Sequence, residues 1–157
     1  MAGQRQDYLV REIGRLRVMI TGLLNPPRTP AKIEEALLLT LDLQTKLFPI
    51  PAEQFLALDA AAQFERLGQN LSDEDAAEEC ATYAELLFHT ATLYDFSDRH
   101  DLATGARQLS LHIALLTHDA YGNEDAHNLV TILATAIDRD ELAAPVRELL
   151  EDFEQRG

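Results

Sequence analysis

Apolar side chains recur every three or four residues along nearly the whole chain, and the first such segment covers residues 4–24. This spacing places them on one face of a helix. The apolar positions of that face are Leu9, Ile13, Leu16, Ile20 and Leu24. The helix should end at Asn25-Pro26-Pro27, because the residue before a proline is pushed out of the helical backbone region.

The same period predicts further helices along the rest of the chain. We expect a second helix from Thr29, with Pro30 at its first position, until the run Pro49-Ile50-Pro51 closes it. Three others are expected over residues 52–67, 72–96 and 99–117. A sixth helix has residues 124–127 in its first turn and apolar positions over 129–137, and a seventh has its apolar positions over 142–153. No stretch alternates with period two between turn signals, so no strand is expected. The pattern therefore predicts an all-α protein of about seven helices.

The segment over residues 72–96 has the strongest start signal. Ser72 supplies an N-cap hydroxyl, and the acidic residues 73–75 suit the positive end of the helix dipole. Its apolar positions form two neighbouring stripes: Cys80, Ala84, Leu87, Ala91 and Tyr94, with Tyr83, Leu86, Thr90 and Leu93 beside them. So wide an apolar surface predicts neighbours on two sides, and we expect this to be the central helix.

The next helix has an apolar stripe of its own, and its start is echoed later in the chain. The stripe consists of Leu102, Ala106, Leu109, Ile113 and Leu116. Residues 98–103 (Asp-Arg-His-Asp-Leu-Ala) resemble residues 138–143 (Asp-Arg-Asp-Glu-Leu-Ala), and Arg107 and Arg147 extend the match at the same offset. Such an echo is typical of stacked helical hairpins, although acidic, Leu/Ala-rich helices also resemble one another by chance.

Residues 84–116 resemble a tetratricopeptide repeat, with Gly105 and Leu109 at the small and aromatic positions of its second helix and Leu102 at the turn. The segment departs from the repeat in lacking Trp, the aromatic residue and the closing proline. At the position equivalent to Gly105 the second unit has Pro145, which would kink or restart the last helix. The resemblance implies stacked antiparallel hairpins, a fragment of a right-handed α-α superhelix.

The whole layout also resembles a family of small uncharacterised bacterial proteins that open with a Gln-Asp-Tyr-hydrophobic-x-Arg helix and end in repeat-like hairpins. Here the opening is Gln6-Asp7-Tyr8-Leu9-Val10-Arg11. The resemblance implies a fold and no activity. We expect one domain over residues 1–157, made of a basic helix with a Pro-rich turn (1–28), a helical pair (29–70) and two tetratricopeptide-like hairpins (72–157).

Charge and cysteine content narrow the function classes. The chain carries a net charge of −14, which argues against nucleic-acid binding. Its unbroken apolar runs, such as residues 36–39, are far shorter than the roughly 20 residues of a membrane span. The start of the chain lacks the apolar core of a secretory signal, and the single cysteine allows no internal disulfide. These features predict a cytoplasmic protein with no integral membrane segment.

Candidate chemistry is sparse. Glu124-x-x-His127 has the spacing of a di-iron bundle motif, but such a site needs a second motif and further glutamates. Glu85 and His89 are one turn apart and form either an acid–base pair or, as we expect, an ordinary surface pair. Cys80 falls on an apolar face and is expected to be a core thiol. The sequence thus predicts no catalytic site, no cofactor and no metal.

Residues 1–28 hold five arginines against Asp7 and Glu12, so a basic first helix with a net charge of +3 precedes an acidic body of −17. This helix either lies on an anionic membrane or an acidic partner, or docks on its own body. We expect docking onto the stripe of Tyr83, Leu86 and Leu93.

Three function classes follow from these patterns. The favoured one is a non-catalytic interaction or scaffold module that holds a protein or peptide partner. The alternative is a self-associating structural or regulatory domain, hence a homo-oligomer. A metal-dependent helical enzyme using Glu124 and His127 is the least favoured.

Overall fold

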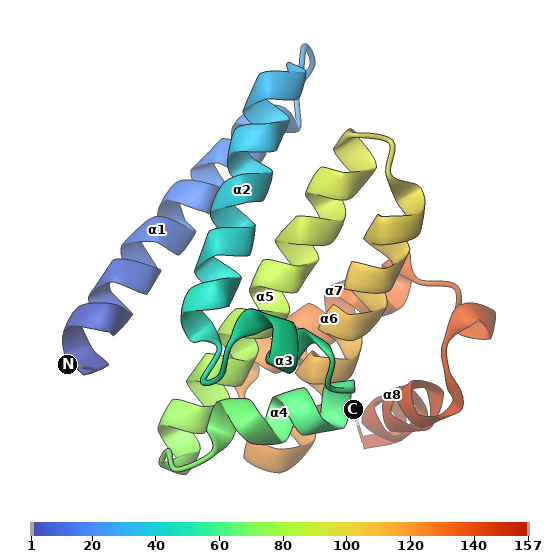
Figure 1. Ribbon diagram of the computed structural model, residues 1–157. Coiled ribbons are helices and arrows are strands. Elements are labelled where there is room, and N and C mark those ends of the chain that lie inside the picture. The colour runs from blue at the N-terminus through green and yellow to red at the C-terminus, as the bar shows by residue number, and fades with distance from the viewer. Residues whose placement is uncertain (1, 157) are drawn as a thin grey trace.

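The computed structural model describes the backbone of residues 2–156 and the side chains of residues 7–156, and this part of the chain is helical with no strand. Figure 1 shows the arrangement. The elements are α1 (Ala2–Leu23), α2 (Pro30–Leu47), α3 (Ala52–Leu56), α4 (Ala60–Gly68), α5 (Asp73–Phe96), α6 (His100–Tyr121), α7 (Glu124–Ala136), the 3-10 helix η1 (Arg139–Glu141) and α8 (Ala144–Arg156). The all-α prediction is confirmed. Asp7 to Arg11 of the opening motif lie in α1, and the side chain of Gln6 lies outside the described residues.

The described residues form eight α-helices where the sequence predicted about seven, because residues 52–67 divide into α3 and α4. Asp59 starts α4 by accepting a hydrogen bond from the Ala62 N–H at 2.9 Å. The amide of Gln63 donates to the carbonyls of Phe55 and Leu58 at the end of α3, and the Phe55 carbonyl also accepts from the Leu58 N–H. A local cap and a side chain from the next helix therefore stabilise the break.

Helix α5 lies at the centre of the molecule, as predicted (Figure 1). It packs against α6, α2, α4 and α7. Both predicted stripes are buried except Tyr94, which is half-buried. The wide apolar surface of α5 is thus covered on several sides, and the faces that remain open are polar.

The cover of the second stripe differs from the prediction, because α2 and α3 occupy the place expected for the first helix. The Thr40 hydroxyl of α2 donates to the Leu86 carbonyl at 3.2 Å. The ring of Tyr83 packs edge-on against Phe55, with centroids 5.7 Å apart. The Tyr83 hydroxyl donates to Gln63 Oε1 at 2.9 Å. Aromatic rings and satisfied polar groups from residues 40–63 leave no room there for α1.

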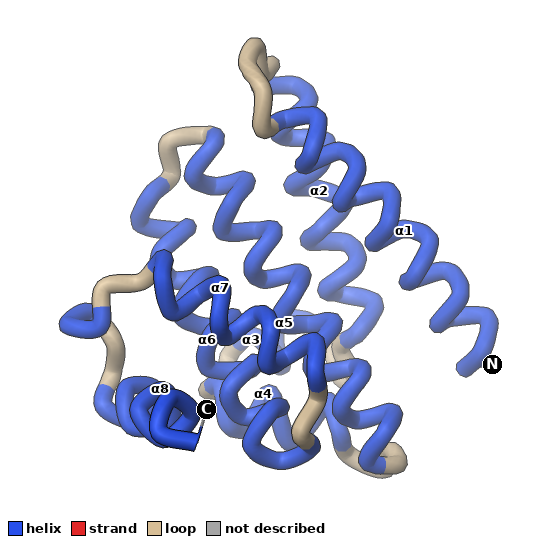
Figure 2. Tube along the Cα trace, turned by 180° about the vertical axis from the view of Figure 1, so that it is seen from behind, coloured by secondary structure: helices blue, strands red, loops and turns tan. Residues whose placement is uncertain are grey.

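Helix α1 is docked on its own body, as expected, but it lies mainly along α2 (Figure 2). Its buried positions are Leu9, Ile13, Leu16, Ile20 and Leu23. Leu24, which the sequence placed in this stripe, lies beyond the helix end and is 55% exposed. Arg28 secures the turn, since its guanidinium donates to the Leu23 carbonyl and lies over the ring of Phe96. Burial of the five side chains is worth about 1.5–3 kcal/mol each before entropy.

The echo in the sequence corresponds to two turns with a shared feature. Arg107 pairs with Asp95 before its turn, and Arg147 donates to the carbonyls of Arg139 and Leu142. Each arginine thus reaches back across the turn that precedes its helix. The turns differ otherwise, because residues 139–141 form η1 and α8 restarts at Ala144 with Pro145 in its first turn.

The predicted stripe of the helix after residue 98 is only partly right. Leu102 is 53% exposed, whereas its echo Leu142 is buried. Helix α6 instead buries Ala103, Leu111 and Ala114, so the face toward α5 and α7 is rotated from the expected one. Contacts on both flanks of α6 explain the difference, because a helix between several neighbours buries more than one stripe.

Candidate interaction groove

A groove of about 660 Å³ lies between α1, α5 and α7. Helix α5 forms its floor with one face, from Glu74 and Glu78 through Ala81 and Glu85 to Phe88. These positions are three or four residues apart and so form one line along the helix. The other faces of α5 are covered by α2, α4 and α6, which leaves this line open between α1 and α7.

Apolar side chains stand on both walls of the groove. Val10 of α1 is 63% exposed and Ile132 of α7 is 52% exposed, although both are large hydrophobic residues. Half-buried Phe88 contributes an aromatic ring to the floor. Apolar groups that converge from three helices on one concave surface are typical of a binding site, whereas single exposed hydrophobic residues are not.

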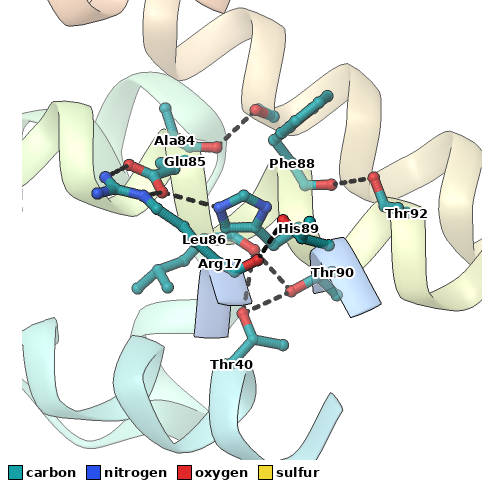
Figure 3. A network of polar contacts seen from close by, with 11 residues as sticks. Arg17, Thr40, Ala84, Glu85, Leu86, Phe88, His89, Thr90 and Thr92 are labelled. Atoms are coloured by element: carbon teal, nitrogen blue, oxygen red, sulfur yellow. Dashed lines mark hydrogen bonds and ion pairs between the residues drawn. The ribbon is translucent and has the colours of Figure 1, made fainter. Parts of the chain in front are cut away.

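Three polar side chains join α1 to the floor of the groove (Figure 3). The guanidinium of Arg17 makes a bidentate pair with the carboxylate of Glu85, with bonds of 2.7 and 2.5 Å. His89 Nε2 lies 2.8 Å from the Glu85 Oε2 atom, one helical turn away. A planar guanidinium matches a carboxylate in this geometry, so the pair fixes the position of α1 beside α5.

The environment of Glu85 favours its charged form. Burial raises the pKa of this carboxyl group, but the hydrogen bonds from His89 and Arg17 outweigh burial and lower the pKa to about 2. Glu85 is therefore ionised at neutral pH, and its charge is compensated by Arg17. The sequence predicted the pair of Glu85 and His89, and the structure confirms it. It adds Arg17 as a second partner of Glu85, and it leaves only 12% of the His89 side chain exposed.

The remaining charges of the groove are acidic. Glu74, Glu78 and Asp125 line it. Within the described residues none of these three carboxylates has a basic group within 4 Å. The groove therefore combines apolar walls with a net negative charge, although Asp125 also interacts electrostatically with Arg17.

The interior behind the groove, which includes the Thr40 and Thr90 side chains labelled in Figure 3, is polar yet fully paired. The Thr90 hydroxyl donates to the Leu86 carbonyl and accepts from the Gln44 amide at 2.8 Å. No buried side-chain polar atom of the described residues lacks a partner. These contacts fix α2 behind α5 and leave no reactive group without a partner there.

The Glu124–His127 motif lies on the outside of α7. Both residues are exposed, and the His127 ring packs with His118 and Phe153 at centroid distances of 5.2 and 5.0 Å. Among the described side chains no three His, Cys, Asp or Glu residues lie close enough to hold a metal ion. The hollow beside Phe153 measures about 10 Å³, room for about one water molecule.

Cys80 lies in the core, as the sequence predicted. It is 0% exposed, and burial raises the pKa of its thiol to about 12. Of the histidines, His100 pairs with Asp95, and burial lowers the pKa of half-buried His112. The pKa of His118 is also lowered, mainly by burial and to a lesser extent by the neighbouring His127. The structure brings none of these groups together with a nucleophile.

No helix in the part of the chain that the structure describes is both long and apolar enough to cross a membrane. No protein-family model, curated protein sequence or solved structure matches the chain.

The sequence did not reveal the groove. Val10 and Ile132 are separated by most of the chain, and the pattern of α1 marks Val10 only as an off-stripe residue. The one available signal was the polar line of α5 on the face opposite its two neighbouring apolar stripes, where Glu74, Glu78 and Glu85 recur at helical spacing.

Proposed function

We propose that this protein is a non-catalytic interaction module that holds a segment of a partner protein in the groove between α1, α5 and α7. The observation that carries the proposal is the meeting of two exposed hydrophobic residues, Val10 and Ile132, on opposite walls of one groove. The buried core of a protein interface is more apolar than the rest of a protein surface, so exposed apolar side chains in a groove suit such a core.

The proposal includes a tetratricopeptide-like arrangement of the C-terminal half, in keeping with the resemblance to small bacterial proteins built of such hairpins. Helix α5 packs on α6, α7 packs on both, and α8 packs on α6. The contacts of α7 with both α5 and α6 are those expected of a helix that stacks on a preceding hairpin, although α7 and α8 do not pack closely on each other. In such a stack the first helix of each hairpin lines the concave side, the side on which α5 and α7 line the groove.

A cytoplasmic setting is part of the same proposal. It is supported by the chain having one cysteine, which is buried and free. The negative net charge bears on the partner, because it disfavours nucleic acid.

Site-specific photo-crosslinking in the cells that produce the protein tests this function. A crosslinking amino acid, p-benzoylphenylalanine, replaces Ile132 in one variant and Leu102 in the other. The two positions match in exposure, 52% and 53%, but Leu102 lies outside the groove. We expect a discrete adduct with a second protein from position 132 and none from position 102.

Two results would contradict the proposal. Equal adducts from both positions would mean unspecific contact, and the absence of any adduct at position 132 would mean that the groove is not occupied. An adduct between two copies of this chain would instead favour a self-associating domain.

A further inference from the structure

The chemistry of the groove also points to the kind of segment it holds, an inference that rests on the proposed function. We propose that the occupant is a cationic amphipathic helix of a partner protein. Its lysine or arginine side chains face Glu74, Glu78 and Asp125, and its apolar side chains lie between Val10 and Ile132.

The charge of the groove is the first argument. The described lining holds four carboxylates and one guanidinium, that of Arg17, which pairs with Glu85 and also interacts electrostatically with Asp125. Its net charge is therefore negative. An anionic segment would meet like charge from both α5 and α7. A cationic segment gains complementarity here, and the −17 of the chain beyond residue 28 attracts it from a distance.

The walls supply the second argument. Exposed Val10 and Ile132 on the walls and half-buried Phe88 on the floor line the same groove as the acidic side chains, and we call these three residues the apolar strip. A purely polar cationic chain would leave this strip in water. The occupant therefore needs apolar side chains on one side and charged ones on the other, the pattern of an amphipathic helix.

The third argument concerns the backbone of the occupant. The described part of the protein contains no strand, so it offers no sheet edge for an extended peptide to pair with. A helix satisfies its own backbone hydrogen bonds and fits such a site. The floor from Glu74 to His89 spans about 22 Å at 1.5 Å per residue, the length of about four helical turns.

The basic helix α1 of the same chain is not this occupant. Its apolar stripe is buried along α2, and Arg17 is engaged by Glu85. The helix serves as a wall of the groove, so a second copy would have to undock its own α1 to insert it.

Fluorescence anisotropy with three labelled synthetic helices of equal length tests the inference. One probe has leucine and lysine at amphipathic spacing, the second has leucine and glutamate, and the third has serine and lysine. We expect the Leu/Lys probe to bind at least about tenfold more tightly than either of the others, because only it matches both the charge and the apolar strip.

Variants of the full chain locate the binding. Glu78→Gln with Asp125→Asn should weaken the Leu/Lys probe about fivefold to tenfold, since each lost pair at an interface rim changes affinity modestly. The matched control, Glu34→Gln with Glu148→Gln, removes the same charge from exposed positions outside the groove and should change affinity less than about twofold. Asp125 lies in the first turn of α7, so the single variant Glu78→Gln provides a test that leaves that helix intact.

Several outcomes would overturn the inference. Equal affinity for the Ser/Lys probe would show diffuse electrostatic attraction, and tighter binding of the Leu/Glu probe would show the opposite charge preference. An equal effect of the control pair would place binding elsewhere, and no binding of any probe would also refute it. The crosslink from position 132 decides the proposed function separately, because it does not depend on the charge of the partner.

Discussion

Neutralising Glu85 should destabilise the protein in a pH-dependent way. Burial alone would raise the pKa of this group, yet bonds from His89 and Arg17 lower it from 4.5 to about 2. A carboxyl whose pKa is depressed in the folded state adds stability above its unfolded pKa. That stability is lost as the pH falls through the folded value. The contribution of Glu85 should thus be complete near neutral pH and decline from about pH 5 toward pH 2.

The magnitude follows from the same values. The gap between 4.5 and about 2 corresponds to about 3 kcal/mol, which is an upper bound. Arg17 keeps 58% of its side chain in water, and solvent screening weakens pairs of this kind. We therefore expect Glu85→Gln to lower the free energy of unfolding by about 1–2 kcal/mol at pH 7, a fold-change of about five to thirty in the unfolding equilibrium.

Urea denaturation of the wild type and Glu85→Gln at about pH 7 and about pH 3 measures this difference. At the lower pH the difference should fall to less than about half of its neutral value. Glu78→Gln is the control, because it removes an exposed carboxylate from the same helix and should change stability by less than about 0.5 kcal/mol. A difference that is the same at both pH values would refute the reasoning, as would a variant as stable as the wild type at pH 7.

Three further predictions concern the core and the docking of α1. Cys80 should react slowly with a thiol reagent in the native protein and rapidly in denaturant, because it is fully buried with a pKa raised to about 12; fast native labelling would show that the core opens. Leu16→Ala should cost about 2–5 kcal/mol in urea denaturation, whereas Val18→Ala, 73% exposed on the same helix, should cost under about 0.5; equal effects would mean that α1 is not docked. Tyr83→Phe should cost about 1–3 kcal/mol by leaving the buried Gln63 acceptor unpaired, and a thermal midpoint equal to the wild type would contradict that bond.

The helices could be predicted because their signals are local. Ser72 and Thr29 cap the helices that follow them, as the sequence indicated. The turn at Tyr121-Gly122-Asn123 also has local causes, since Gly122 has a φ of 65° and Asn123 accepts from the Ala126 N–H. The division of residues 52–67 into two helices was not predicted, because the Gln63 amide that stabilises it donates to a carbonyl eight residues earlier, that of Phe55.

The packing partners could not be predicted, because periodicity shows which face is apolar and not what covers it. The sequence predicts that α1 covers the stripe of Tyr83, but α2 and α3 cover it, through the contacts of Thr40 and Phe55 with α5. The groove depends on such choices. Arg17 and Glu85 are 68 positions apart, so no local pattern indicates that they meet.

Two contributions of different size hold α1 in place: the burial of its apolar stripe and its ion pair with α5. The buried stripe around Leu16 contributes several kcal/mol and decides that α1 docks, whereas the pair of Arg17 and Glu85 contributes about 1–2 kcal/mol. The pair lies at the groove, however, and the apolar stripe faces α2. Loss of the pair should therefore leave α1 docked while the wall that carries Val10 becomes less fixed. Glu85→Gln should then weaken binding of the Leu/Lys probe more than Glu78→Gln does, because it both loosens this wall and leaves the charge of Arg17 without its partner at the groove.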